Sequence, residues 1–116
     1  PEPEWRWDAL ERSRENQDSE TWKVDGSLNA YRYVLKGLYL WERKYYDEAI
    51  ADLRKGLEQM PGFYESYAFL ADAYYRRGEA NLAAEAYHTL NEKDPALLKD
   101  LVRRYPDIEE SYRASE

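Results

Sequence analysis

Apolar residues recur every three or four positions along most of the chain, which is the spacing of one face of an α-helix. No stretch of convincing length alternates apolar and polar residues as a strand does. The pattern predicts a first helix over about 28–43 and a second that begins at Asp47 and ends near Gln59, before Pro61 and Gly62. We therefore expect an all-α chain.

The same pattern returns 34 positions later. Three pairs of residues have this spacing: Tyr33 and Tyr67, Ala49 and Ala83, and Pro61 and Pro95. A fixed period of this size predicts one helix–turn–helix unit used twice, in which each copy buries its apolar face on its neighbour. Binding of another molecule is the default activity of such an array.

The helix ends carry residues suited to caps and corners. The predicted N-caps are Asp25 or Ser27, then Asp47, and Asn81 in the second copy. Gly78 occupies the place that Lys44 has in the first copy. Because glycine has no Cβ, we expect Gly78 to take the left-handed conformation of a tight corner between helices.

These residues resemble the tetratricopeptide repeat (TPR) family, whose unit carries an aromatic residue, Leu, a small residue and Tyr in its first helix, then Ala, an aromatic residue, Ala and Pro. The matching positions are Tyr33, Gly37, Leu40, Ala49, Leu53, Gly56 and Pro61, then Tyr67, Leu70, Ala71, Tyr74, Ala83, Tyr87, Leu90 and Pro95. The chain departs from the family at Lys36, Leu40 and Leu90, where Leu, Tyr and a small residue are usual. The resemblance implies a short right-handed superhelix of antiparallel helix pairs, a TPR-like α-solenoid with capping helices.

The period divides the chain into four parts, with the two repeats at 30–63 and 64–97. Two repeats need caps over their terminal apolar faces. After them, 98–116 is expected to form a solvating helix and tail, because five apolar residues recur at helical spacing after Pro95: Leu97, Leu98, Leu101, Val102 and Tyr105. We expect Pro106 to end that helix and Asp107 to cap a last short turn.

The segment 1–29 is predicted to be a Trp-rich helical cap. Trp5, Trp7 and Trp22 lie in it, and a polar linker would not carry them. Pro3 at a helix start predicts a helix of about ten residues. Few apolar residues follow it, so that helix needs its indoles to dock on something.

The 116 residues carry a formal net charge of -7. A phosphate backbone requires a basic surface, so the charge argues against nucleic acid as a partner. The charge favours a cationic partner only weakly, and the better-supported interpretation is that it keeps the protein soluble. Hydrophobic residues make up 43% of the chain, enough for the core of one small domain.

Targeting signals and disulfides are absent from the sequence. No apolar run approaches the roughly 18 residues of a membrane helix, and the first residues lack a signal-peptide pattern. There is no cysteine, which excludes disulfides and thiolate metal sites. We therefore expect no membrane insertion and a cytoplasmic location.

The sequence offers no set of catalytic or metal-binding residues. His88 is the one histidine, so no second histidine or cysteine completes a metal site or a nucleophilic triad. Asp47 with Glu48 lies at a predicted helix start, where acids favour the helix dipole. We expect no enzyme activity, no cofactor and no metal.

The resemblance selects the side chains of a binding groove, because the first helix of each TPR lines a concave surface that contacts a peptide. Carried onto this chain, that surface comprises Tyr31, Val34, Leu38, Trp41 and Glu42 from the first copy, and Glu65, Ala68, Asp72, Tyr75 and Arg76 from the second. Family members that grip a chaperone's C-terminal carboxylate use Lys and Asn where this chain has Val34 and Leu38. The predicted partner is therefore a hydrophobic peptide or an amphipathic helix of another protein, with Trp41 and Tyr75 as anchors.

Two alternatives stay open for this apolar surface. The segment 5–15 can cover it from within the same chain, since exposed apolar patches are costly in a monomer. The N-terminal Trp-rich segment can also cap or swap into another copy, which makes the chain a self-assembling homo-oligomer.

Overall fold

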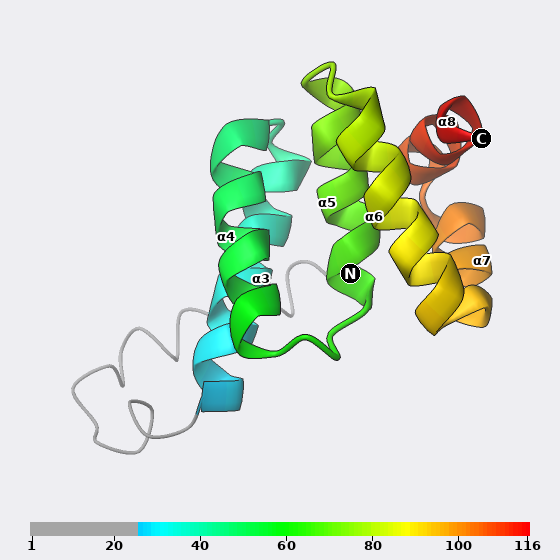
Figure 1. Ribbon diagram of the computed structural model, residues 1–116. Helices are drawn as coiled ribbons and strands as arrows, with labels where there is room; N and C mark the ends of the chain where they lie inside the picture. Colours follow the sequence, from blue (N-terminus) through cyan, green and yellow to red (C-terminus); the bar gives the residue numbers. More distant parts are fainter. Residues whose placement is uncertain (1–25) are drawn as a thin grey trace. The chain divides into compact units, whose positions relative to one another are not determined.

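The computed structural model describes residues 26–116, with side chains from residue 29 on. Every element in this part of the chain is a helix, which confirms the all-α class (Figure 1). The chain divides into two compact units, residues 1–62 and 63–116. The predicted Trp-rich helix at 5–15 and the cap at Asp25 lie outside the described residues.

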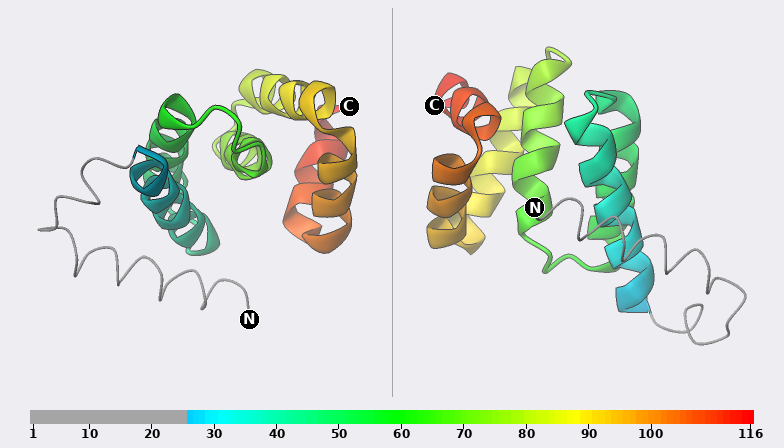
Figure 2. Two further views of the ribbon diagram at one scale, coloured as in Figure 1. Left: turned by 90° about the horizontal axis from the view of Figure 1, so that it is seen from below. Right: turned by 180° about the vertical axis from the view of Figure 1, so that it is seen from behind.

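In the first unit two helices form an antiparallel pair. α3 covers Gly26–Glu42 and α4 covers Tyr46–Gln59, and they lie side by side in every view (Figures 1 and 2). Glycines allow this close approach. A Cβ at Gly56 would lie 2.7 Å from Val34 Cγ2, and one at Gly37 would lie 2.7 Å from Leu53 Cγ.

In the second unit, the large and the small residue of the Val34–Gly56 contact change places between the two helices. Val34 and Gly56 of the first copy correspond, 34 positions on, to Ala68 and Leu90. Val34 is 1% exposed, and Ala68 and Leu90 are fully buried. The small residue is on the second helix in the first copy and on the first helix in the second copy, so each pair combines one large and one small side chain.

The unusual Lys36 has a partner on α4. Lys36 Nζ lies 3.9 Å from Asp52 Oδ2, and Asp52 is buried. The equivalent residues of the second unit are Leu70 and Ala86, so a charged pair replaces an apolar one. Burial raises the pKa of Asp52, although Lys36 and Lys55 act to lower it. The ionised carboxylate at neutral pH is thus held in a partly desolvated position.

Both corners between paired helices use a left-handed residue. Gly78 has a φ of 87°, which confirms the predicted conformation, and Lys44 has a φ of 68° at the equivalent position. A side chain with a Cβ is strained in this region, whereas glycine is not. The first copy therefore keeps the corner geometry without the residue that best suits it.

The predicted N-caps at Asp47 and Asn81 are wrong. α4 begins at Tyr46 after Tyr45, and α6, Ala80–Lys93, begins after Glu79. Neither Tyr45 nor Glu79 makes a side-chain cap hydrogen bond. Each helix starts directly from the left-handed corner, so Asp47 lies in the first turn, where its charge favours the helix dipole. α3 begins at Gly26, which places Ser27 inside the helix and not at a cap.

The second unit holds four helices, α5 (Glu65–Arg76), α6, α7 (Pro95–Arg104) and α8 (Pro106–Ser115). α5 and α6 form an antiparallel pair (Figure 1). α7 contacts both helices of that pair, and so does α8 (Figure 2). α7 lies where the sequence predicts the solvating helix, and its Leu98 and Leu101 are buried.

The end of the chain forms a full helix where the sequence predicted a short turn. Tyr105 is extended, and α8 then runs for 10 residues from Pro106. Asp107 is not its cap, because Tyr105 precedes the helix and the Asp107 carboxylate lies toward Arg76. Pro106 stands 34 residues after Asp72, which is inside α5. Proline cannot continue the helix there, so α7 and α8 divide the place of one first helix of a third repeat.

We predict that Lys44→Gly stabilises the protein by about 1 kcal/mol, because glycine removes the strain of a side chain at positive φ. The free energy of unfolding in urea measures the effect. The matched control is Arg54→Gly, at an exposed position within α4, which is expected to lose about 1 kcal/mol through the low helix propensity of glycine. Equal losses from both substitutions would show that the Lys44 corner is unstrained.

We predict that the double substitution Lys36→Leu with Asp52→Ala is at least as stable as the native chain at pH 7, because it restores the apolar pair of the second unit. With the folded pKa of Asp52 raised, the native state binds this proton more tightly than the unfolded chain does. Stability contributed by this group therefore falls as the pH rises through the window above the unfolded value of about 3.9.

Urea unfolding at pH 4 and pH 7 measures both effects. Lys36→Leu alone removes the closest cation from Asp52, so its loss of stability is expected to be larger at pH 7 than at pH 4. A double variant less stable than Lys36→Leu alone would contradict the proposed cost of burying Asp52.

Candidate functional site

The first half of the predicted groove is largely buried. Its five residues all lie on α3, where Val34, Leu38 and Trp41 are 1%, 7% and 8% exposed. Val34 packs on α4 at Gly56. Tyr31 is half-buried and Glu42 is exposed. Of the five predicted residues on α3, Tyr31 and Glu42 are thus the most accessible to a partner. The segment 5–15, the predicted internal cover, lies outside the described residues.

The second half of the predicted groove lies on α5. Ala68 and Asp72 are fully buried, while Glu65, Tyr75 and Arg76 are half-buried. The Arg76 guanidinium carbon lies 5.3 Å from the centre of the Tyr75 ring, as a cation–π contact requires. The accessible side chains of α5 therefore combine one aromatic ring, one acid and one cation.

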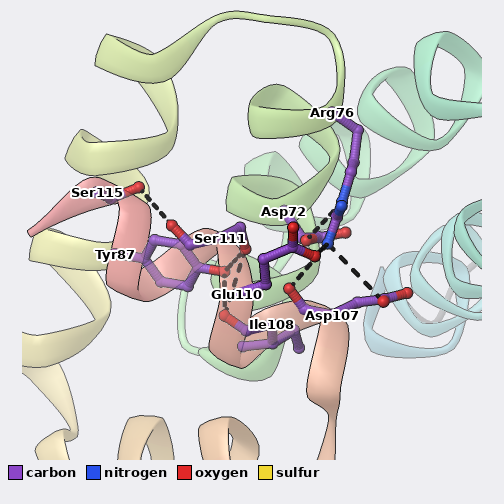
Figure 3. Close-up of polar contacts among 8 residues, drawn as sticks. All are labelled: Asp72, Arg76, Tyr87, Asp107, Ile108, Glu110, Ser111 and Ser115. Carbon is purple, nitrogen blue, oxygen red and sulfur yellow. Dashed lines mark hydrogen bonds and ion pairs between the residues drawn. The ribbon is translucent and has the colours of Figure 1, made fainter.

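Arg76 joins α5 to α8 through a cluster of acids (Figure 3). Its Nε donates to Asp72 Oδ1 at 3.3 Å, within α5. Its Nη2 donates to the Asp107 carbonyl at 3.1 Å and to Glu110 Oε1 at 3.0 Å, and lies 3.8 Å from Asp107 Oδ1. The Arg76 guanidinium is thus paired with three carboxylates from two helices.

The charge of Arg76 is fixed at physiological pH. Burial acts to lower the pKa of Arg76, but the carboxylates of Asp72, Glu110 and Asp107 outweigh it and raise the pKa above its ordinary value. The guanidinium remains charged, as arginine does in proteins. Because three acids surround one cation, the cluster keeps an excess of negative charge when all of them are ionised.

A buried hydroxyl pair forms a second link between α8 and the α5–α6 pair (Figure 3). Tyr87 Oη of α6 lies 2.5 Å from Ser111 Oγ, and it donates to the Ile108 carbonyl at 3.3 Å. Ser111 Oγ donates to the same carbonyl at 3.3 Å. Burial raises the pKa of Tyr87 well above its ordinary value, so the phenol stays protonated and able to donate.

Apolar contacts surround these polar links. Ile108 is fully buried. The Tyr105 ring meets Phe69 of α5 edge to face at 5.3 Å, and the Tyr112 ring meets Tyr87 in the same way at 5.2 Å. The α8 segment therefore binds the α5–α6 pair through an apolar anchor, two aromatic contacts and a polar edge.

A separate apolar depression of about 400 Å³ is formed by residues of α6, α7 and α8. It is lined by Asn91, Pro95, Ala96, Leu98, Lys99, Val102 and Tyr112. None of the predicted groove residues lines it. Beside it, Asp100 accepts hydrogen bonds from Arg103 and Arg104, which lower the pKa of its carboxyl and brace the end of α7.

A match to a known family agrees with this architecture of helix pairs. A family model described as tetratricopeptide repeat matches residues 40–107, more than half of the chain. The chain belongs to the tetratricopeptide repeat family. TPR repeats generally mediate interactions between proteins, and the family is typically non-catalytic. No curated protein matches the chain significantly.

The described part of this TPR protein contains no group of three side chains that could hold a metal ion. His88 is exposed, and its Nε2 atom lies 3.6 Å from Glu92 Oε2 on the same helix. Within residues 26–116, no helix is both long enough and apolar enough to cross a membrane.

Sequence reasoning selected Arg76 and Asp72 but missed their partners on α8. One signal was available, because Glu110 stands 34 residues after Arg76 and therefore takes the equivalent position in a third copy. The same spacing relates Ile108 to Tyr74, a core residue of α5. The TPR period thus continues into α8, past the proline that interrupts it.

We predict that Tyr87→Phe lowers the free energy of unfolding by about 1 kcal/mol, since it removes a buried hydroxyl and leaves Ser111 with fewer partners. Ser111→Ala is expected to cost a similar amount, and the double variant less than the sum, because both hydroxyls belong to one network. Tyr112→Phe is the control, since it preserves the ring that contacts Tyr87 and is expected to change stability by less than about 0.5 kcal/mol. Additive losses in thermal or urea unfolding would show that the two hydroxyls act independently.

Proposed function

We propose that this TPR protein is a non-catalytic interaction module that binds a peptide or an amphipathic helix of another protein. Its membership of the TPR family is the observation that carries the proposal. The binding surface is proposed to lie on the first helix of each repeat, α3 and α5. The accessible residues there are Tyr31, Glu42, Glu65, Tyr75 and Arg76.

The chemistry of these residues suits a helix better than a carboxylate terminus. Tyr31 and Tyr75 present rings with polar tips, which are frequent anchors in protein interfaces. Glu42 and Glu65 favour basic residues beside the apolar stripe of the partner. An amphipathic helix supplies both features at a spacing of three or four residues.

Trp41 is unsuitable as a probe of this surface. It is 8% exposed, and truncation of a buried Trp costs about 3–5 kcal/mol of stability. Its substitution would test the fold and not the interface.

We predict that Tyr31→Ala with Tyr75→Ala weakens capture of the physiological partner by about tenfold or more, as loss of interface aromatics does. The tagged native chain and each variant are used to capture proteins from the source cell, and the bound proteins are quantified. The matched control is Tyr45→Ala, which removes a tyrosine that is 53% exposed at the corner before α4. Circular dichroism verifies that every variant is folded.

The expected result is a set of proteins retained by the native chain and by Tyr45→Ala but lost with the double variant. Equal recovery of every bound protein by a folded double variant would contradict binding through α3 and α5.

A further inference from the structure

The contacts of α8 have the form of a helix bound in a groove. Along α8 and the residue before it, Tyr105, Ile108 and Tyr112 lie at positions i, i+3 and i+7 and meet the apolar surface of α5 and α6. Asp107 and Glu110 form a polar edge at positions one turn apart. This is the pattern by which amphipathic helices bind to proteins, with apolar anchors on one stripe and charges beside it.

Arg76 is complementary to that edge and lies on the predicted binding surface. Its Nη2 atom is 3.0 Å from Glu110 Oε1 and 3.1 Å from the Asp107 carbonyl. The side chain of Arg76 is only 21% exposed, so its contacts are partly shielded from water. A residue expected to face a partner therefore already holds a helix.

The attachment of α8 is limited in extent. The helix has 10 residues, and helices of this length are marginal on their own. Pro106 interrupts the helix between α7 and α8, and Tyr105 is the single residue that joins the two helices. α8 is held on the α5–α6 pair by the hydrogen bonds at Arg76 and Tyr87, the buried Ile108 and the ring contacts of Tyr105 and Tyr112, and it also contacts α7.

We propose that the surface around Arg76 and Tyr87 is a docking seat for a partner helix, and that α8 is a built-in competitor that occupies it. The partner has the chemistry of α8, with two acids one turn apart flanking a β-branched apolar residue, then a small hydroxyl residue and an aromatic one. This inference rests on the proposed function, because it names the class of helix that one part of the binding surface accepts.

Occupancy by α8 lowers the apparent affinity for the partner. Only the fraction of molecules with an empty seat binds, and the tether places α8 at a high effective concentration. Substitutions that weaken α8 in its seat, without altering the seat, are expected to strengthen binding of a helix added in trans.

The test uses a fluorescent peptide with the sequence of residues 104–116, titrated with the full chain and followed by anisotropy. Glu110→Lys places a cation beside Arg76 and frees the seat, and is expected to raise peptide affinity about tenfold over the native chain, the equivalent of one charge pair. Glu109→Lys is the matched control, because Glu109 Oε2 accepts from Arg113 within α8 and does not contact Arg76. It loses only that exposed pair within α8, so it is expected to change the affinity by about twofold or less.

A second peptide tests whether the seat recognises the two acids of α8. With both acids replaced, Asp107→Lys and Glu110→Lys, it is expected to lose binding to the Glu110→Lys chain. Should the Glu110→Lys chain prove unfolded by circular dichroism, Glu110→Gln removes the charge alone and is expected to give a smaller gain in the same direction. No gain with a folded variant, or equal binding of both peptides, would overturn the proposal.

Failure of this test is distinct from failure of the proposed function. A partner whose capture requires Tyr31 and Tyr75 but is unaffected by Glu110→Lys would support the interaction module and refute the seat. If the α8 peptide binds as expected but the tyrosine substitutions do not affect partner capture, the seat is supported and the binding surface on α3 and α5 is refuted.

Discussion

The buried carboxylate of Asp72 is the constraint on which the arrangement of the second unit depends. A charge without solvent must be paired, and the Nε of Arg76 lies 3.3 Å from it, one turn further along α5. That bond directs the guanidinium so that its Nη2 meets α8, where Asp107 and Glu110 accept it. The position of the last helix is thus coupled to a charge in the middle of α5, and the residues that stabilise the fold also create the polar edge of the candidate seat.

The two repeats reach the same helix pair by different residues. The first uses Val34 against Gly56, whereas the second has Ala68 and Leu90 at those positions, which moves the larger side chain to the second helix. It also has Lys36 and Asp52 where the second has Leu70 and Ala86. An apolar pair of similar size would avoid the cost of desolvating the carboxylate. The departure of the first copy at Lys36 is therefore matched by a second change, Asp52, on the other helix of the pair.

The helices from α3 to α7 and their order could be predicted from the sequence, because apolar periodicity and proline positions are local signals, whereas α8 was expected only as a short turn. The left-handed Gly78 was predictable for the same reason. The N-caps were not, since each second helix starts from the corner, so that Asp47 and Asn81 are the second residues of their helices and not the caps. The groove residues came from the family pattern, which states where a side chain lies on a helix but not what covers it. Burial of Trp41 and the link between Arg76 and Glu110 depend on packing between helices, which periodicity within one helix does not encode.

Pro106 explains how one stretch of chain can serve both as a cap and as a competitor. At the equivalent position α5 carries Asp72 and continues unbroken, so its two halves move as one rigid rod. In the third copy the proline removes an amide donor and Tyr105 becomes extended, which divides the rod into α7 and α8. α7 retains the buried Leu98 and Leu101 and continues to cover the end of the repeats when α8 leaves. Without that break, release of α8 would also remove α7 and expose the core, and exchange with a partner helix would cost the stability of the whole unit.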